Sequence, residues 1–132
     1  MPKRILVVDD EPTIRQVFDL TLSDAGYAVT AVGDGNSALS AVTSQCFDLI
    51  FLDILLPDAH GSEILAKLKQ LTPTSIVCVV TAMTASDYQR IEDYTKLIKM
   101  GIKDKLLRKP LSPEEIVRVA RELIGNGEPA VG

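Results

Sequence analysis

Short apolar runs alternate along the chain with longer stretches in which polar and apolar residues mix. The runs that predict strands cover residues 4–9, 27–32, 48–53, 75–81 and 103–108. Three of them contain "ILVV", "LIFL" and "IVCVV", which are continuously apolar and rich in β-branched side chains. Such runs are typical of strands that are covered on both faces of a parallel sheet.

The stretches between these runs carry apolar residues with the 3.6-residue period of a helix. The predicted helices cover about residues 12–26, 36–44, 62–71 and 85–100, and the last begins after residue 112. Gly26 is the residue expected to end the first of them. The segment "SPEE" predicts a capping box at the start of the last helix, with Ser112 as the N-cap and Glu115 three residues later.

Five strands that alternate with five helices predict an α/β fold, namely an open parallel (βα)5 sheet with helices on both faces. With 132 residues, the chain is long enough for one domain with its own hydrophobic core. We expect this domain to span residues 1–125. Residues 126–132, "NGEPAVG", are expected to be a tail or the start of a linker.

Composition and charge argue against a secreted, membrane-spanning or nucleic-acid-binding protein. Lys3 and Arg4 are followed by only four apolar residues, too few for a signal peptide or a membrane span. Cys46 and Cys78 lack metal-ligand spacing and favour a reduced, cytoplasmic protein. Residues 96–109 carry six basic residues and one acid. No aromatic residues or nucleic-acid motif accompany them, so we expect no direct binding of DNA or RNA.

Chemically useful side chains follow several predicted strands. Asp9 and Asp10 end the first strand and Asp53 the third, while Thr81 ends the fourth and Lys109 lies just after the fifth. Ligands of open parallel sheets bind beyond the carboxyl ends of the strands. Three carboxylates at that position suit Mg²⁺, and a lysine with a threonine hydroxyl suits phosphoryl oxygens.

Each of these residues also has an ordinary structural explanation. Taken alone, the acid pair could cap the helix that follows it, and Asp53 could cap a loop. Thr81 is at home in a strand, and Lys109 on a solvated surface. If all these explanations held, four strand ends would carry side chains suited to one site only by chance. The joint pattern therefore favours a site for a cation and a phosphoryl group.

The motifs resemble those of the response-regulator receiver domains of two-component signalling, over residues 3 to about 125. The matching segments are "ILVVDDE", "GDGNSAL", "DLIFLDILLPDAHG", "VVTA" and "KPL". The resemblance implies a flavodoxin-like doubly wound sheet with strand order 2-1-3-4-5. It also implies a phosphorelay function, in which a histidine kinase phosphorylates an aspartate and so switches the surface of the fourth helix, fifth strand and fifth helix.

Residue by residue, the resemblance implies that Asp53 is the phosphoacceptor and that Thr81 and Lys109 contact its phosphoryl group. The ligands implied for Mg²⁺ are the side chains of Asp9, Asp10 and Asp53 and the backbone carbonyl of Leu55. The domain would catalyse its own phosphorylation and dephosphorylation, which leaves its standing as an enzyme open. The implied partners are a sensor histidine kinase or phosphotransfer protein and a downstream effector protein or output domain, without a membrane. A phosphorylation-dependent homodimer stays an open option.

Two departures from the family pattern and several other interpretations remain. Leu106 stands where many receivers carry Tyr or Phe, and Thr81 and Lys109 are further apart in sequence than usual.

A pseudo-receiver that binds protein without phosphorylation is one alternative, although the intact acids, threonine and lysine argue against it. A flavodoxin-like cofactor binder would meet repulsion from "DDEPT", and a metal-dependent phosphohydrolase lacks an acid pair after the third strand. The sequence identifies neither the kinase nor the oligomeric state, nor whether the receiver stands alone.

Overall fold

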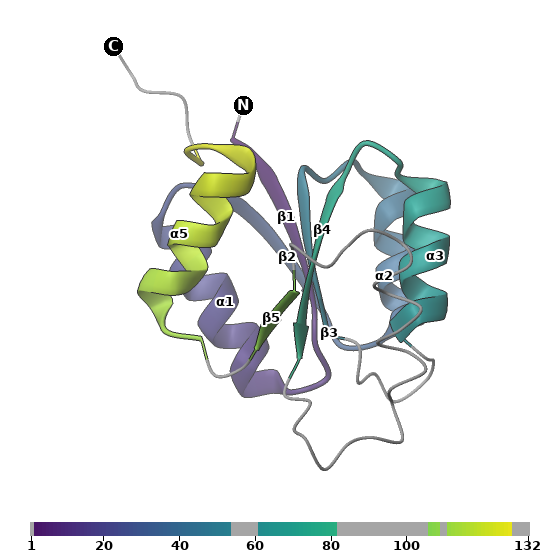
Figure 1. Ribbon diagram of the computed structural model, residues 1–132, viewed down its shortest axis with the longest axis horizontal. Coiled ribbons are helices and arrows are strands. Elements are labelled where there is room, and N and C mark those ends of the chain that lie inside the picture. The colour runs from purple at the N-terminus through teal and green to yellow at the C-terminus, as the bar shows by residue number, and fades with distance from the viewer. Residues whose placement is uncertain (1, 54–60, 82–105, 109–110, 128–132) are drawn as a thin grey trace.

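The computed structural model describes residues 2–53, 61–81, 106–108 and 111–127, and these form a parallel sheet between two layers of helices (Figure 1). The strands have the order β2-β1-β3-β4-β5. They are β1 (Arg4–Val8), β2 (Ala28–Val32), β3 (Leu49–Asp53), β4 (Ile76–Thr81) and β5 (Leu106–Arg108). All pairs are parallel, so every strand ends at one edge of the sheet, here called the carboxyl edge. The opposite edge is the amino edge.

The helices within the described residues cover both faces of the sheet. They are α1 (Pro12–Asp24), α2 (Gly35–Ser44), α3 (Gly61–Leu71) and α5 (Pro113–Ile124). α1 and α5 lie on one face, and α2 and α3 on the other (Figure 1). The predicted doubly wound α/β fold and its strand order are therefore confirmed. The predicted fourth helix, residues 85–100, and the start of the predicted fifth strand, residues 103–105, lie outside the described residues.

The two layers of helices enclose two separate hydrophobic cores, because alternate residues of each strand point to opposite faces of the sheet. Leu6 and Leu52 belong to the core under α2 and α3, whereas Val7 and Phe51 belong to the core under α1 and α5. Phe18 of α1 packs on Phe51 with ring centroids 5.1 Å apart and a tilt of 59°, an arrangement that aromatic pairs prefer. Burial on both faces explains why these strands are continuously apolar in sequence.

The ends of α1 and α5 follow local signals in the sequence. Ser112 Oγ accepts the Glu115 N–H at 3.2 Å, and the Glu115 carboxylate accepts the Ser112 N–H at 3.5 Å, so the predicted capping box is confirmed. Gly26 follows α1 with a φ of 96°, in the left-handed region that favours glycine. These signals determine where both helices of this layer begin or end.

The residues that follow α5 return to the amino edge of the sheet. The Lys3 N–H donates to the Gly127 carbonyl at 2.9 Å, and the Tyr27 hydroxyl donates to the Gly125 carbonyl at 2.5 Å. Gly127 is buried, and a Cβ at this position would lie 2.6 Å from the carbonyl carbon of Gly26. The first part of the predicted tail is therefore packed on the domain, while its remainder lies outside the described residues.

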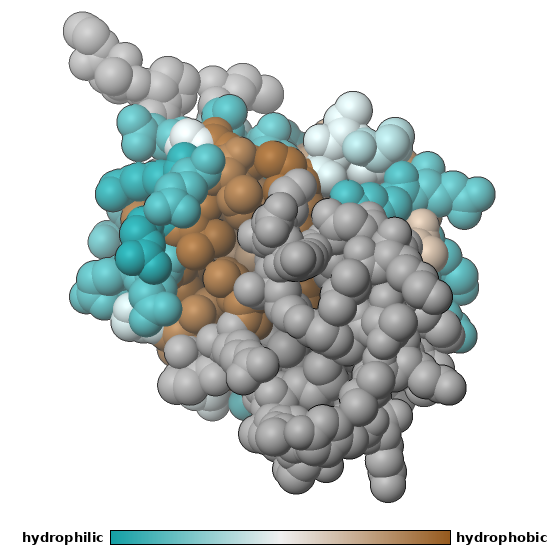
Figure 2. Space-filling view, in the orientation of Figure 1, coloured by the Kyte–Doolittle hydropathy of each residue, from teal (hydrophilic) through white to brown (hydrophobic). Residues whose placement is uncertain are grey.

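Apolar side chains also reach the surface of the molecule. Figure 2 shows such side chains gathered beside α5 on one face. Partly buried apolar residues at the border of the α1 and α5 core include Ile76, Leu107, Val119 and Leu123. Within the described ranges, no helix has the length and apolar character needed to cross a membrane.

Candidate functional site

The register of the sheet brings the acids after β1 and within β3 side by side. Val8, the last residue of β1, pairs with Leu52 of β3. Asp9 and Asp53 are the next residues on the two segments, so they face each other at the carboxyl edge. A parallel pairing thus converts two acids that are distant in sequence into neighbours in space.

Asp9, Asp10 and Asp53 form an acid cluster at this edge. One carboxylate oxygen from each residue lies within 4.8 Å of the other two. Asp9 and Asp53 are only 3% and 4% exposed, whereas Asp10 is exposed to solvent. Negative charges at this separation repel one another, and burial strengthens the repulsion. A cation bound between them would remove that repulsion, and the exposed Asp10 leaves the cluster open to solvent.

Three described hydrogen bonds anchor Asp9 in this cluster. Its N–H donates to the Val32 carbonyl at 3.1 Å and extends the pairing of β1 with β2 by one residue. Its Oδ1 accepts the Glu11 N–H at 2.9 Å, and its backbone carbonyl accepts a hydrogen bond from Nη1 of Arg15 at 2.8 Å. The carboxylate of Asp9 is therefore tied to the turn between β1 and α1, and its backbone is tied to β2 and to α1.

The structure argues against a simple capping role for the acid pair. Glu11, and not Asp9 or Asp10, is the N-cap residue of α1, and its side chain makes no capping hydrogen bond. The next helix provides a contrast, because Asp34 is the N-cap of α2 and its Oδ1 accepts the Ser37 N–H at 2.7 Å. An acid that caps a helix therefore follows β2, whereas the acid pair that follows β1 lies beside Asp53.

The remaining predicted site residues are described only in part. Thr81 ends β4 and directly follows Val80, which pairs with Asp53. The Thr81 backbone therefore lies at the same edge as the acid cluster, but its side chain is outside what the structure describes. Leu55 and Lys109 both lie outside the described residues. The roles expected of these three residues stay predictions.

Two residues next to the acid cluster were not predicted from the sequence. Arg15 donates to the Asp9 carbonyl, as described above. Gly33 lies beside the Arg15 guanidinium, because a Cβ on Gly33 would be 2.8 Å from Arg15 Nη1. The signal that could have identified Arg15 is its position in the first turns of α1, where the helix dipole disfavours a cation. Gly33 lies in the matching segment "GDGNSAL", but that match does not indicate its closeness to Arg15.

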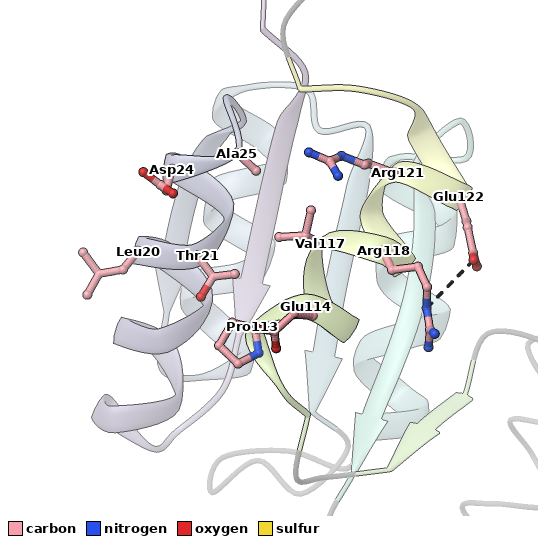
Figure 3. Close-up of a pocket in the computed structure, with 10 residues that line it drawn as sticks. All are labelled: Leu20, Thr21, Asp24, Ala25, Pro113, Glu114, Val117, Arg118, Arg121 and Glu122. Carbon is pink, nitrogen blue, oxygen red and sulfur yellow. Dashed lines mark ion pairs between the residues drawn. The ribbon is translucent and has the colours of Figure 1, made fainter.

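A groove lies between α1 and α5 (Figure 3). It has a volume of about 970 Å³, and Leu20 and Val117 contribute apolar side chains to it. At its border, the Arg118 Nε and the Glu122 carboxylate are 4.0 Å apart and form an exposed ion pair, a contact that contributes little to stability. None of the acid-cluster residues lines this groove, so it is separate from the candidate site.

The chain matches a known family over most of its length. The family model of the response regulator receiver domain matches residues 5–121. The chain therefore belongs to the response regulator receiver domain family of two-component signal transduction, as its motifs predicted. The acid cluster lies at the edge of the sheet where that resemblance implies the phosphorylation site.

One curated relative shows how the chain compares in length. The probable transcriptional regulatory protein TcrX of Mycobacterium tuberculosis is 37% identical over 123 residues. The match covers 93% of this chain and 50% of the relative. The chain thus spans about half the length of this curated relative.

Three solved structures resemble this one closely. A CheY-like response regulator receiver domain protein from Methanospirillum hungatei JF-1 is 29% identical, with a TM-score of 0.82 over 92% of this chain and 93% of that one. A response regulator protein from Burkholderia pseudomallei with a phosphorylated aspartic acid and a calcium ion is 26% identical, with a TM-score of 0.76 over 92% and 66%. Response regulator TrrA from Thermotoga maritima in complex with Mg²⁺ and BeF is 27% identical, with a TM-score of 0.73 over 92% and 99%.

Proposed function

We propose that this domain is a cytoplasmic, Mg²⁺-dependent phosphoacceptor in a two-component phosphorelay, with Asp53 as the acceptor. The observation that carries the proposal is the convergence of three carboxylates from two neighbouring strand ends within 4.8 Å of one another. Such a concentration of like charge in a largely buried position costs stability unless a cation binds there. The phosphorylated aspartic acid in the Burkholderia pseudomallei relative supports the same conclusion.

The residues of the acid cluster fit a Mg²⁺ ion. Carboxylate oxygens are the hard ligands that Mg²⁺ prefers, and the exposed Asp10 leaves room for the water molecules that Mg²⁺ retains. The proposed ligands are Asp9, Asp10, Asp53 and the backbone carbonyl of Leu55. When bound, the ion would supply positive charge next to the phosphoryl oxygens of an incoming donor. The complex of TrrA with Mg²⁺ and BeF supports this choice of ion.

The proposed reaction is the transfer of a phosphoryl group to a carboxylate. A carboxylate oxygen of Asp53 forms a bond to phosphorus while the bond between phosphorus and the donor histidine nitrogen breaks. The electron pair of the broken bond stays on the histidine nitrogen, so no other co-reactant is required. Asp9 and Asp10 would provide the charge that retains the cation beside Asp53.

The proposed partners follow from the reaction. A sensor histidine kinase or phosphotransfer protein would donate the phosphoryl group, and Thr81 and Lys109 would contact it on Asp53. Phosphorylation would then switch the surface formed by the fourth helix, β5 and α5 toward an effector protein or output domain, or toward a second copy of the chain. The length of the relative, about twice that of this chain, supports an attached output domain. We place the receiver domain at residues 1–125.

Phosphoryl uptake tests the proposal directly. We expect the wild-type chain incubated with Mg²⁺ and acetyl phosphate to gain the mass of one phosphoryl group, and to lose this ability when the metal is chelated. Asp53→Ala should show no gain. Asp48→Ala is a matched control, because Asp48 directly precedes β3 while Asp53 ends it.

Two results would contradict the proposal. A mass gain that persists in Asp53→Ala would place the acceptor elsewhere. No gain in the wild-type chain would instead favour the pseudo-receiver, which binds a protein partner without phosphorylation.

A further inference from the structure

Arg15 is a charged residue of α1 whose side chain is directed toward the body of the domain. Asp19 and Asp24 on the same helix are exposed, whereas Arg15 is half-buried. Its Nη1 donates to the backbone carbonyl of Asp9 at 2.8 Å. A guanidinium is the side chain best suited to hold a carbonyl in this way, because its donors are fixed in one plane.

Gly33 provides the space in which this guanidinium lies. A Cβ on Gly33 would be 2.8 Å from Nη1 and 3.4 Å from Cζ of Arg15. Gly33 is not among the described glycines with positive φ, so its backbone conformation does not require glycine. The absence of a side chain at this position therefore serves the packing of Arg15 and not the shape of the turn.

Arg15 and Gly33 complete a frame around Asp9. The Asp9 N–H bonds to Val32, the residue just before Gly33, and the Asp9 carbonyl bonds to Arg15. The guanidinium of Arg15 thus lies beside both the Asp9 carbonyl, which follows β1, and Gly33, which follows β2. Because Asp10 directly follows the Asp9 carbonyl, the same contact orients the peptide from which both acids of the pair project.

We propose that Arg15, seated over Gly33, is a positioning residue for the acid pair and sets the geometry with which it binds a divalent cation. The proposal rests on the cation site of the proposed function. By charge alone, a guanidinium near the cluster would repel the cation and weaken its binding. Positioning of the acid pair by Arg15 would strengthen cation binding, whereas its charge would weaken binding. A cation titration of Arg15 variants shows which effect is larger.

The test is the binding of Mg²⁺ and Ca²⁺, measured by titration calorimetry on the full chain as wild type, Arg15→Met, Arg15→Lys and Gly33→Ala. Residues that orient metal ligands typically change affinity by about tenfold or more. We expect Arg15→Met to bind Mg²⁺ about tenfold more weakly than wild type. Arg15→Lys should recover part of the loss, since an ammonium can still donate to the Asp9 carbonyl.

Gly33→Ala is the second arm, because it displaces the guanidinium while it retains the charge. It should also weaken Mg²⁺ binding. In both weakened variants the loss should be larger for Mg²⁺ than for Ca²⁺, because Mg²⁺ demands near-ideal octahedral geometry and Ca²⁺ tolerates irregular sites. A general loss of stability or a change of charge would affect both ions alike. Arg118→Met, on the exposed face of α5, is the charge-matched control and should bind as wild type does.

The proposal is overturned if either Arg15→Met or Gly33→Ala binds Mg²⁺ as tightly as wild type, or if both ions lose affinity equally. A wild-type chain that binds no Mg²⁺ overturns it as well. A wild-type chain that binds Mg²⁺ but takes up no phosphoryl group contradicts only the phosphoacceptor proposal, since the titration still decides the role of Arg15.

Discussion

The polar groups at the amino and carboxyl edges of the sheet have different neighbours. At the amino edge, the Arg4 N–H donates to the Asp48 carboxylate at 2.8 Å, and the Ser75 hydroxyl donates to the Phe47 carbonyl at 2.5 Å. Each of these polar groups has a partner of complementary character. At the carboxyl edge, Asp9 and Asp53 are brought together as like charges, with Asp10 beside them.

This difference indicates which edge serves stability and which serves function. Hydrogen bonds between complementary groups, such as those at the amino edge, contribute modestly to folding. Clustered carboxylates oppose folding unless a ligand neutralises them. Local features that oppose the fold are expected where a protein carries out its function. Substitutions at the two edges should therefore have separable effects, on stability at one and on cation binding at the other.

The largest effect is expected at the amino edge, from Gly127→Ala. A Cβ at this position would lie 2.6 Å from the Gly26 carbonyl carbon and 2.8 Å from the Tyr27 nitrogen, both of which are backbone atoms that cannot move aside easily. We expect the free energy of unfolding to fall by about 2–3 kcal/mol, at the upper end of overpacking costs. Chemical denaturation measures this change.

Asn126→Ala is the matched control for this prediction, because Asn126 is the exposed neighbour of Gly127. It should leave stability unchanged. If the amino edge serves stability alone, the folded Gly127→Ala protein should bind Mg²⁺ as wild type does. A reduced affinity in that variant would mean that the two edges are not separable.

Asp10→Asn should produce the next largest effect, at the carboxyl edge. A hard cation loses one charged ligand, and we expect Mg²⁺ affinity to fall about tenfold, which corresponds to about 1.4 kcal/mol. Without Mg²⁺, stability should stay equal or rise slightly, because one of three like charges is removed. Calorimetric titration and denaturation measure the two quantities. Asp24→Asn makes the same charge change on exposed α1 and should leave affinity unchanged.

Tyr27→Phe should produce a smaller effect that depends on pH. Near neutral pH the variant loses the hydrogen bond to the Gly125 carbonyl, and we expect a loss of about 1 kcal/mol in stability. Burial raises the pKa of the Tyr27 phenol above its usual value of 10.0, while the positive charge of Arg121 partly opposes this rise. As the pH rises through 10, the unfolded state therefore loses the phenolic proton before the folded state does.

The contribution of Tyr27 should consequently be complete below pH 10 and decline as the pH rises through the pKa of the folded protein. Unfolding curves of wild type and Tyr27→Phe between about pH 8 and pH 11 measure it, since the difference between them isolates this residue. A difference that grows with pH would contradict the predicted direction of the shift.

Much of the fold could be predicted because its signals are local. Continuous apolar runs predicted the strands, and the "SPEE" segment predicted the start of α5 through the contact between Ser112 and Glu115. The edge that gathers Asp9 and Asp53 followed from the rule that parallel strands end together. The starts of β2, β3 and β4 fall one residue later than predicted, at Ala28, Leu49 and Ile76.

Two other contacts between segments distant in sequence could not be predicted. Gly33 is explained by the guanidinium of Arg15, which belongs to α1, and no local sequence pattern indicates that contact. Gly127 was expected in a loose tail, yet its burial depends on the close approach of Gly26 across the amino edge. In both cases a glycine makes room for a partner that is supplied only by the folded chain.

The most direct measurement of the central claim, that the carboxyl edge is a phosphoacceptor site centred on Asp53, is chemical mapping of the phosphoryl group. Borohydride reduces an aspartyl phosphate to homoserine, which peptide sequencing by mass spectrometry can locate. After treatment with acetyl phosphate and Mg²⁺, we expect homoserine in place of Asp53 and intact aspartate at Asp9 and Asp10. Homoserine at either residue of the acid pair, or a phosphoryl group that resists borohydride, would contradict the claim.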